Sequence, residues 1–454
     1  MRRPSISNPW MRLTTAGVTA GLVLLAISTP VGAAGRPSLV KDINPTDTSG
    51  PVHITQVGNR VFFQADDGVH GAELWKSDGT AAGTKMVKNI WPGFGGSWPD
   101  YLVNVNGTLF FTADDGTHGR ELWKSDGTKA GTVMVKDIHT GPSSQVGGNS
   151  TTLHGSPIVV GNRLFFFADT GDSGSTLYVS DGTAGGTHVV SDATFFPPDD
   201  AFEGTAGGRF YFVTLDADGG AWDIAHLWAS DGTSAGTHAL AGAPIAPSMS
   251  ILPVNGAKMY FYTDRLWRTD GTAAGTKQLT SPGELNGAPT QSALMNSRLY
   301  FNGGALWKTN GTANGTRQIL DEQVDALMTA SSKLYVSTSL VSEGGLTNTY
   351  LWVSDGTHAG TLPLAGFCCG NFYAPRQLVA VGDKVCFVVQ DWATDSWELW
   401  ASQGTAVGTY EVKSFVHPFP PFLTDEPMGV AVGSKLYFAA DDGVHGGELW
   451  SYTP

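Results

Sequence analysis

One short motif recurs through almost the whole chain and constrains its fold more than any other feature. Its fullest form is Glu-Leu-Trp-Lys-Ser-Asp-Gly-Thr at residues 121–128, followed by Gly131-Thr132 and the apolar segment 133–138. Repetition at intervals of roughly 40 to 55 residues is typical of propeller blades. The Leu-aromatic pair at the centre of the motif begins at Leu74, Leu122, Leu177, Leu227, Leu266, Leu306, Leu351, Leu399 and Leu449.

Each unit is predicted to contain four short antiparallel strands. Segments such as 60–63, 108–111 and 435–438 are β-branched and aromatic, as strands prefer. Gly-Asn or Gly-Asp pairs before several such segments predict tight hairpin turns. The Leu-Trp segment supplies the third strand, and a segment like 133–138 supplies the fourth. Because no stretch shows sustained helical periodicity, the predicted fold class is all-β, a β-propeller of four-stranded antiparallel blades.

A turn of the form Ser-Asp-Gly-Thr, or a close variant, follows the aromatic residue in eight units. Glycine reaches positive φ without a steric penalty. An Asp or Asn side chain can accept hydrogen bonds from the backbone amides just ahead of it. Gln403 departs from this pattern, because its longer side chain does this poorly. A structural role in the turns is predicted for Asp78, Asp126, Asp181, Asp231, Asp270, Asn310 and Asp355.

The two ends of the repeat region are complementary halves of one unit. Residues 39–43 match the fourth strand of other units but follow no Leu-Trp segment, whereas 448–450 is a third strand with no fourth strand after it. A closed ring explains the split, because pairing the halves hides the last strand edge. We therefore predict nine repeat units, eight whole and one split between the termini. Because propellers usually have four to eight blades, the alternative is an eight-bladed ring with one degenerate unit outside it.

The repeats resemble the ELWxxDGT repeat family of secreted bacterial proteins, also labelled hyalin-like. The resemblance rests on Trp, Asp, Gly and Thr residues that recur in register over about residues 39–454. It implies a propeller-like, secreted repeat scaffold. It implies no established reaction.

Residues 1–33 are predicted to be a secretory signal peptide. Three arginines flank or precede the apolar run 16–27, and small residues precede a cut near Ala34, the pattern of an export signal. The apolar run is shorter than the about 20 residues that a spanning helix needs, so we expect no membrane insertion. Residues 34–454 are then a single β-propeller domain outside the cytoplasm, whether extracellular, periplasmic or on the cell surface.

The chain is acidic, with a formal net charge of −14. Such a surface disfavours nucleic acid, whose affinity rests on phosphate neutralisation, and is compatible with divalent cations. A candidate calcium site contains Asp216, Asp218 and Asp223, with the Asp-x-Asp-Gly spacing that begins a calcium loop. It lacks the twelve-residue pattern and the terminal glutamate, so a solvated acidic loop is the competing interpretation. No other cofactor is expected.

Several repeated side chains have both a structural and a chemical interpretation. Asp-Asp-Gly-x-His-Gly loops at 66–71, 114–119 and 441–446 could hold a metal, but Asp and Gly are turn residues in any case. The repeated Trp residues fit packing between blades better than sugar stacking. For the recurring glutamates, pairing across strands is favoured over glycosidase chemistry; these are Glu73, Glu121, Glu398 and Glu448.

The cysteines permit one disulfide. Cys368 and Cys369 are adjacent, and Cys386 lies in a predicted second strand. In an oxidising compartment one of the adjacent pair could bridge to Cys386, and we assign the pairing Cys369–Cys386. An odd thiol remains.

No convincing catalytic site is present in the sequence, so no catalytic residue is assigned. The leading hypothesis is a secreted, non-catalytic repeat scaffold, acting as a monomer, that binds or adheres to an extracellular protein or glycan. The alternative is a secreted hydrolase or lyase that acts on polysaccharide, an analogy from fold alone. Acidic or aromatic residues that break the repeat and converge at one mouth of the ring would distinguish a functional site from the scaffold.

Overall fold

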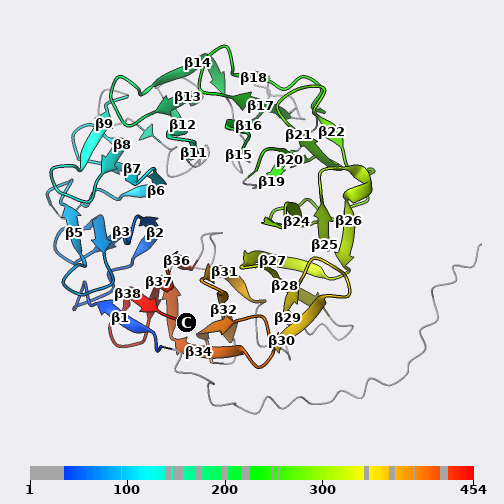
Figure 1. The fold of residues 1–454 in the computed structure, drawn as a ribbon. Coiled ribbons are helices and arrows are strands. Elements are labelled where there is room, and N and C mark those ends of the chain that lie inside the picture. The colour runs from blue at the N-terminus through cyan, green and yellow to red at the C-terminus, as the bar shows by residue number, and fades with distance from the viewer. Residues whose placement is uncertain are drawn as a thin grey trace, which may run out of the picture. The chain divides into compact units, whose positions relative to one another are not determined.

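The chain folds into a ring of nine blades. The computed structural model describes residues 35–93, 95–138, 145–146, 157–169, 175–195, 203–215, 225–244, 246, 249–252, 256–341, 347–367, 374–391, 394–419 and 428–454. Residues 35–454 form one compact unit, in which four-stranded antiparallel blades follow one another around the ring (Figure 1). The predicted nine-bladed β-propeller is confirmed, and the eight-bladed alternative is wrong.

Each blade runs from its innermost to its outermost strand in chain order, except the split one. Blade 1 contains β2 (Val52–Val57), β3 (Arg60–Asp66), β4 (Ala72–Ser77) and β5 (Lys85–Lys88); blade 2 contains β6 (Asp100–Val105), β7 (Thr108–Asp114), β8 (Arg120–Ser125) and β9 (Val133–Lys136); blade 3 contains β11 (Ile158–Val160), β12 (Arg163–Asp169), β13 (Ser175–Ser180) and β14 (His188–Phe195). Blade 4 contains β15 (Glu203–Ala206), β16 (Arg209–Leu215), β17 (Ala225–Ser230) and β18 (His238–Ala239); blade 5 contains β19 (Ser250–Leu252), β20 (Met259–Tyr262), β21 (Leu266–Thr269) and β22 (Lys277–Gln278); blade 6 contains β23 (Ser292–Met295), β24 (Arg298–Asn302), β25 (Leu306–Thr309) and β26 (Arg317–Leu320). Blade 7 contains β27 (Gln323–Ala330), β28 (Lys333–Val341), β29 (Thr347–Ser354) and β30 (Thr361–Phe367); blade 8 contains β31 (Arg376–Val381), β32 (Lys384–Asp391), β33 (Ser396–Ser402) and β34 (Thr409–Phe415); blade 9 contains β36 (Gly429–Val432), β37 (Lys435–Asp441), β38 (Gly447–Tyr452) and β1 (Ser38–Lys41).

Two strands lie outside the four-stranded pattern that the sequence predicts. β10 (Gln145–Val146) pairs with both β12 and β8 and so joins blades 2 and 3 into one sheet, and β35 (His417–Phe419) adds to β37 in blade 9. A 3-10 turn, η1 (Ala313–Gly315), follows β25. None of the described residues belongs to a helix long and apolar enough to cross a membrane.

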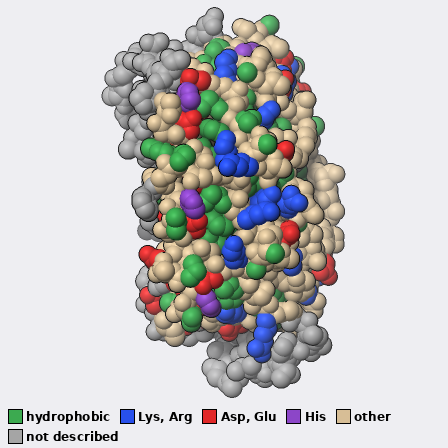
Figure 2. All heavy atoms as spheres, turned by 90° about the vertical axis from the view of Figure 1, so that its left-hand side faces the viewer, with side chains coloured by type: hydrophobic (Ala, Val, Ile, Leu, Met, Phe, Trp, Pro, Cys, Tyr) green, Lys and Arg blue, Asp and Glu red, His purple; other side chains and the backbone are tan. Residues whose placement is uncertain are grey.

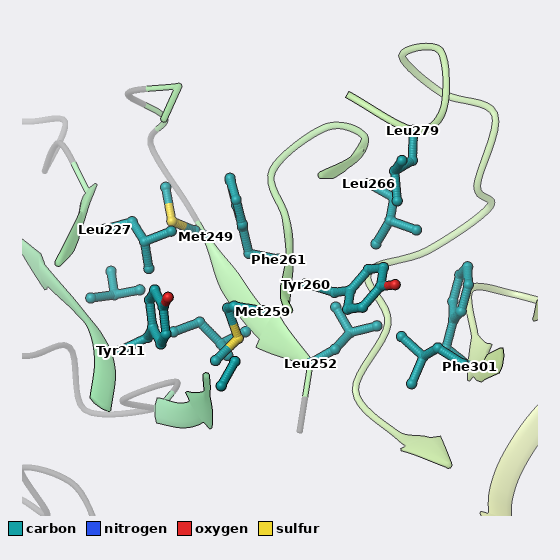
Figure 3. Packing of buried hydrophobic residues seen from close by; sticks show 14 of the residues in the cluster. Tyr211, Leu227, Met249, Leu252, Met259, Tyr260, Phe261, Leu266, Leu279 and Phe301 are labelled. Carbon is teal, nitrogen blue, oxygen red and sulfur yellow. The ribbon is translucent and has the colours of Figure 1, made fainter. Parts of the chain in front are cut away.

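Leu and Trp at adjacent positions of the third strand pack each blade against both of its neighbours. On β4, Trp75 joins a cluster shared with blade 9, whereas the adjacent Leu74 joins a cluster shared with blade 2. Side chains on neighbouring positions of a strand point to opposite faces, so a Leu-Trp pair covers both faces of its blade. The repeated Trp residues therefore contribute to the core. One hydrophobic cluster extends over blades 4, 5 and 6, and Tyr211, Leu252 and Phe261 are buried in it (Figure 3).

The Asp-Gly-Thr turns are held by a fixed set of hydrogen bonds. In blade 2, Oδ1 of Asp126 accepts from the amide of Thr128 at 2.8 Å and from its hydroxyl at 2.7 Å. The Thr128 hydroxyl in turn accepts from the amide of Gly131 at 2.9 Å. Asn310 makes the corresponding bonds to Thr312. The same side-chain acceptor is seen at Asp78, Asp181, Asp231, Asp270 and Asp355.

The glycine of each turn also has a packing role between blades. All eight turn glycines have φ between +79° and +90°, a region that disfavours other residues. A Cβ at Gly127 would lie 3.0 Å from Phe62 of blade 1, and one at Gly182 would lie 2.6 Å from Phe110 of blade 2. A lysine of the preceding blade binds the same turn, since Nζ of Lys124 donates to the Gly182 carbonyl at 2.7 Å. The turn is thus a contact between blades as well as a hairpin.

The ring is closed by pairing of the two chain ends. β1 pairs antiparallel with β38, with Ser38 opposite Ser451 and Leu39 opposite Trp450; the two strands lie side by side in Figure 1. This confirms that the ninth unit is split between the termini. The paired strand is Ser38–Lys41, where the sequence predicts residues 39–43, and a register shift lies between Leu39 and Lys41.

A buried carboxylate extends the closure beyond strand pairing. Glu448 accepts hydrogen bonds from the amides of Ile43 at 3.1 Å and Asn44 at 3.2 Å, and from the hydroxyl of Ser49 at 2.7 Å. Burial raises the pKa of Glu448, although these three donors oppose the shift. We call this arrangement, a buried glutamate that binds the amides of the segment connecting two blades, the glutamate clasp.

The first prediction concerns the clasp. Glu448→Gln should lower the free energy of unfolding at pH 7 by roughly 2 kcal/mol, because an amide nitrogen would face one of the backbone N–H donors. Chemical denaturation would measure the loss, with Glu411→Gln, an exposed position on β34, as the control. Equal stability of the two variants would contradict a role for Glu448 in closure.

The second prediction concerns the turns. Asp126→Ala should cost about 1 kcal/mol, because two donors of Thr128 lose their acceptor. Asp126→Asn should be close to wild type at pH 7, because Asn310 already makes the same bonds. Urea melts at neutral pH would rank the three proteins.

The same variants give a pH test. Hydrogen bonds from the Thr128 hydroxyl and amide hold the pKa of Asp126 below its usual range. Its stabilising contribution is therefore complete above the unfolded pKa near ~3.9 and is lost as the pH falls through the lower folded pKa. Asp126→Asn should lose less stability than wild type over that interval. A parallel loss in both proteins would show that the carboxylate is not the titrating group.

Candidate functional site

The two ends of the strands carry different kinds of connection. The Asp-Gly-Thr turns join third to fourth strands at one end. The loops between second and third strands, and the crossovers between successive blades, lie at the other end, because antiparallel strands alternate in direction. We call this second end the crossover face. It contains the loops 66–71, 114–119 and 441–446, the crossover 42–51, and the described parts, 89–93 and 95–99, of the next crossover.

The three Asp-Asp-Gly-x-His-Gly loops are closed by their own side chains. In blade 1, Oδ1 of Asp67 accepts from the amides of Val69 at 3.0 Å and His70 at 2.9 Å, and Oδ2 lies 2.8 Å from Nδ1 of His70. Blades 2 and 9 have equivalent bonds. Figure 2 shows histidines beside acidic side chains, spaced along one edge of the side of the ring that faces the viewer. The carboxylates of these aspartates therefore accept hydrogen bonds from their own loops and stabilise the turns.

The Asp-His contact also shifts the pKa values of its partners. Burial opposes ionisation of Asp115, but hydrogen bonds from the amide and ring of His118 outweigh it and leave the pKa lowered. The hydrogen bond that the His118 ring donates to Asp115 raises the pKa of His118. The pair therefore favours a protonated, partly exposed histidine as the pH falls.

The predicted calcium and disulfide residues are only partly placed. Asp216, Asp218 and Asp223 lie outside the described residues, as does Cys369. Cys386 is buried on β32, and burial raises the pKa of its thiol to about 12. Among the described residues no group of three His, Cys, Asp or Glu side chains is arranged to hold a metal ion. The calcium site and the disulfide stay predictions.

Glu73 and Glu448 bind crossover amides and a serine instead of pairing across strands, contrary to the sequence-based prediction for these two residues. Glu73 is fully buried and accepts from the amides of Ile90 at 3.0 Å and Trp91 at 3.1 Å and from the hydroxyl of Ser97 at 2.6 Å. This is the same clasp as that of Glu448, now within a continuous crossover. Glu121 binds the amide of Ile138 at 3.1 Å. Glu398 differs, since its carboxylate accepts from the indole N–H of Trp400. A carboxylate that is bound by amides in this way is a structural acceptor.

The crossovers into blades 1 and 2 make the same backbone hydrogen bond at equivalent positions. The residue at that position is Gly50 in the first crossover and Trp98 in the second. The amide of Gly50 donates to the Gly447 carbonyl at 3.0 Å, and the amide of Trp98 donates to the Ala72 carbonyl at 3.0 Å. Both residues follow a clasped serine and precede a proline, and both have positive φ, +54° for Gly50 and +47° for Trp98. Trp98 therefore occupies a position that is conformationally suited to glycine, at a cost of about 1 to 3 kcal/mol.

Trp98 is exposed although it is held at several points. The residue is 54% exposed, and no other Phe, Trp or Tyr whose side chain the structure describes is exposed. The indole N–H donates to the Gly95 carbonyl at 2.7 Å. Nη1 of Arg120 donates to the Trp98 carbonyl at 2.9 Å. These bonds fix the backbone and one ring edge, so the indole is presented to solvent in a defined orientation.

A partly exposed ion pair joins His53 to Asp100, which follows Trp98 by two residues. Nε2 of His53 is 3.2 Å from Oδ1 of Asp100, which also accepts from the amide of Tyr101 at 2.6 Å. The inner strands β2 and β6 both have a register shift here, and φ is +56° at His53 and +51° at Tyr101. Blade 8 has the same shift on β31, where φ at Gln377 is +51°. The bulge is therefore a recurring feature of inner strands, and at this corner it redirects the side chains around Asp100.

These residues form the candidate functional site, which we call the blade 1–2 corner. It consists of His53, Trp98, Asp100, Tyr101 and Arg120. The Tyr101 hydroxyl is buried with no hydrogen-bond partner among the described residues, and burial raises its pKa to about 12. Sequence reasoning missed this corner, although aligning Ser49-Gly50-Pro51 with Ser97-Trp98-Pro99 would have exposed the unlike residue.

Comparisons with known proteins give no family. No family model matches the chain, and no curated protein matches it either. Similar solved structures include the computationally designed Ika8 protein, with 13% identity and a TM-score of 0.45 over 79% of this chain and 96% of that chain. BamB from Moraxella catarrhalis has 11% identity and a TM-score of 0.40 over 94% of this chain and 99% of its own. A puromycin-hydrolyzing peptidase of Mycobacterium tuberculosis has 11% identity and a TM-score of 0.43 over 87% of this chain and 57% of its own. Similarities this low carry no functional argument.

The third prediction tests the geometry of the closed loops. The pKa of His118 should be higher than that of a free histidine, and Asp115→Asn should bring it back toward the reference value near ~6.5, because the amide carries no charge. NMR titration of the ring protons would measure both values. Val69→Ala, on the equivalent loop of blade 1, should leave the titration unchanged. If Asp115→Asn did the same, the Asp115–His118 contact would not exist in solution.

Proposed function

We propose that this protein is a secreted, non-catalytic binding scaffold that attaches to an extracellular glycan or protein. The observation that carries the proposal is the division of the chain into two sets of residues. Those that repeat are used in turns, clasps and contacts between blades. Among those that break the repeat is Trp98 of the blade 1–2 corner, an exposed tryptophan two residues before Asp100 of the His53–Asp100 pair. Membership of the ELWxxDGT repeat family belongs to the same proposal.

The charged groups that are described support binding rather than polysaccharide hydrolysis. Glycoside hydrolysis commonly uses two carboxyl groups on either side of the scissile bond. Glu73 and Glu448 are buried and bound to backbone amides. At the corner, Asp100 is bound to His53 and to the Tyr101 amide. A binding site needs no second carboxylate, and the indole, carboxylate and imidazole offer an apolar surface with polar groups beside it.

The fourth prediction tests export and the absence of catalysis together. The protein should be found outside the cytoplasm, cut near Ala34, and attached to extracellular polymer. Cell fractionation with N-terminal sequencing would locate it, and release by polysaccharide-degrading enzymes or by protease would give the polymer class. Incubation of the purified protein with that polymer should leave the chain length unchanged by size-exclusion chromatography.

Two outcomes would contradict the scaffold proposal. Shortening of the polymer that disappears in Asp100→Asn would favour the hydrolase or lyase alternative. Confinement of the protein to the cytoplasm would remove the basis for an extracellular partner. The exposed loop variant Val444→Ala serves as the control for nonspecific effects of surface substitution, because Val444 is 78% exposed and lies in blade 9.

A further inference from the structure

We propose that Trp98 is a stacking platform for a pyranose ring of an uncharged glycan, with Asp100 and His53 placed to bind its hydroxyl groups. The inference rests on the scaffold function and assigns its ligand class. It follows from four features of the blade 1–2 corner: exposure of the indole, restraint of its orientation, use of a position suited to glycine, and the mixture of polar groups beside it.

The exposed indole is not explained by packing. Third-strand tryptophans of this chain, such as Trp75 and Trp123, are 5% exposed and lie in the core. Trp98 comes instead from a crossover, and the residue is 54% exposed. The other large exposed apolar side chains of the described region are Val and Leu residues. Trp98 therefore presents a broad aromatic surface that its own fold does not bury.

The backbone at Trp98 is a further reason to assign a function. Gly50 occupies the equivalent position of the preceding crossover within the same set of hydrogen bonds, with a similar φ. Glycine satisfies that conformation without strain, so folding alone does not require an indole there. Strained residues that the surrounding structure holds in place are characteristic of binding and catalytic sites. Glu73, through Ser97 and the amides of Ile90 and Trp91, supplies that restraint.

Restraint of the ring favours recognition of a flat, weakly polar ligand. The indole N–H is already bonded to Gly95, so the ring can offer its face but no new edge donor. The C–H groups on one side of a pyranose pack well against an electron-rich aromatic face. Asp100 and His53 have side chains that are 36% and 26% exposed and can accept and donate hydrogen bonds to hydroxyl groups.

Charge selects the class of glycan. The chain has a formal net charge of −14, which repels polyanions. The guanidinium of Arg120 in this corner already donates to the Trp98 carbonyl and the Thr112 hydroxyl. Asp100, two residues from Trp98, also disfavours a carboxylated or sulfated sugar. A cationic peptide could instead use the indole face through a cation–π contact. A single exposed ring is a small surface for a protein partner, because stable protein interfaces bury about 800 Å² on each side. We therefore commit to the uncharged glycan.

The experiment uses cellohexaose, mannohexaose and hexa-N-acetylchitohexaose as uncharged probes, an alginate hexasaccharide as the anionic probe, and octalysine as the cationic probe. Isothermal titration of the full-length protein should show binding of at least one uncharged probe and none of the alginate fragment. Trp98→Gly should weaken that binding about tenfold or more, and Trp98→Phe should weaken it less, because stacking area is lost in that order. Val444→Ala should bind as wild type does.

Stability separates a lost platform from a damaged fold. Trp98→Gly should melt at the same temperature as wild type or higher, because glycine relieves the positive φ. A folded variant without binding supports the platform. An NMR indole cross-peak that is absent from Trp98→Phe should also shift when the uncharged probe is added to wild type, which tests the contact without a destabilising substitution.

The contrary outcomes are distinct. If wild type and Trp98→Gly bind an uncharged probe equally, the platform is refuted while the scaffold function stands. If octalysine alone binds and requires Trp98, the ligand class is wrong. If any probe is cleaved, the scaffold function itself fails. If wild type binds none of the probes, the uncharged-glycan assignment is overturned.

Discussion

The glutamate clasp is the interaction on which both closure and the candidate site depend. A propeller must lead the chain from the outermost strand of one blade to the innermost strand of the next, and the crossover leaves backbone amides that no strand satisfies. Burying a carboxylate is unfavourable unless it is hydrogen-bonded. Glu73 and Glu448 each meet that condition with two amides and a serine hydroxyl. Burial raises the pKa of both, against the effect of those donors.

The clasp acts together with contacts that hold each blade to its neighbour. A turn glycine lies against an aromatic side chain of the preceding blade, and a lysine of that blade binds the turn carbonyl. A second lysine series, at Lys41, Lys88 and Lys136, binds carbonyls of the next blade at 2.8 to 3.0 Å. These contacts lie between sequence neighbours, so they repeat with the motif. Only the split blade must join segments from opposite ends of the chain, so we expect loss of the clasp to cost more stability at Glu448 than at Glu73.

The architecture could be predicted from the sequence because a repeated motif repeats its geometry. Alternation of Leu and Trp gave the third strands, and the unpaired halves at residues 39–43 and 448–450 indicated the closed ring. The role of the glutamates could not be predicted, since their partners are amides of a crossover whose path is not encoded in any short pattern. The strands β10 and β35 could not be predicted either, because each lies in a connecting segment that pairs with a neighbouring strand. The hydrogen bond from Lys124 to the Gly182 turn of the next blade could not be predicted either, because it depends on how the two blades lie against each other.

The candidate site was harder to predict for a different physical reason. Sequence patterns identify what is shared among units, whereas function on a repeat scaffold depends on what differs. A tryptophan in a crossover looks like one more apolar residue until its φ and exposure are known. Two crossovers have the same clasp and the same backbone hydrogen bond. Gly50 adopts the positive φ of this position without strain, whereas Trp98 adopts it with strain, and this difference identifies Trp98 as unusual. The clasp at Glu73 thus also holds a crossover in which a tryptophan occupies a conformation suited to glycine, and this rigidity is what allows an unfavourable backbone geometry to persist at Trp98.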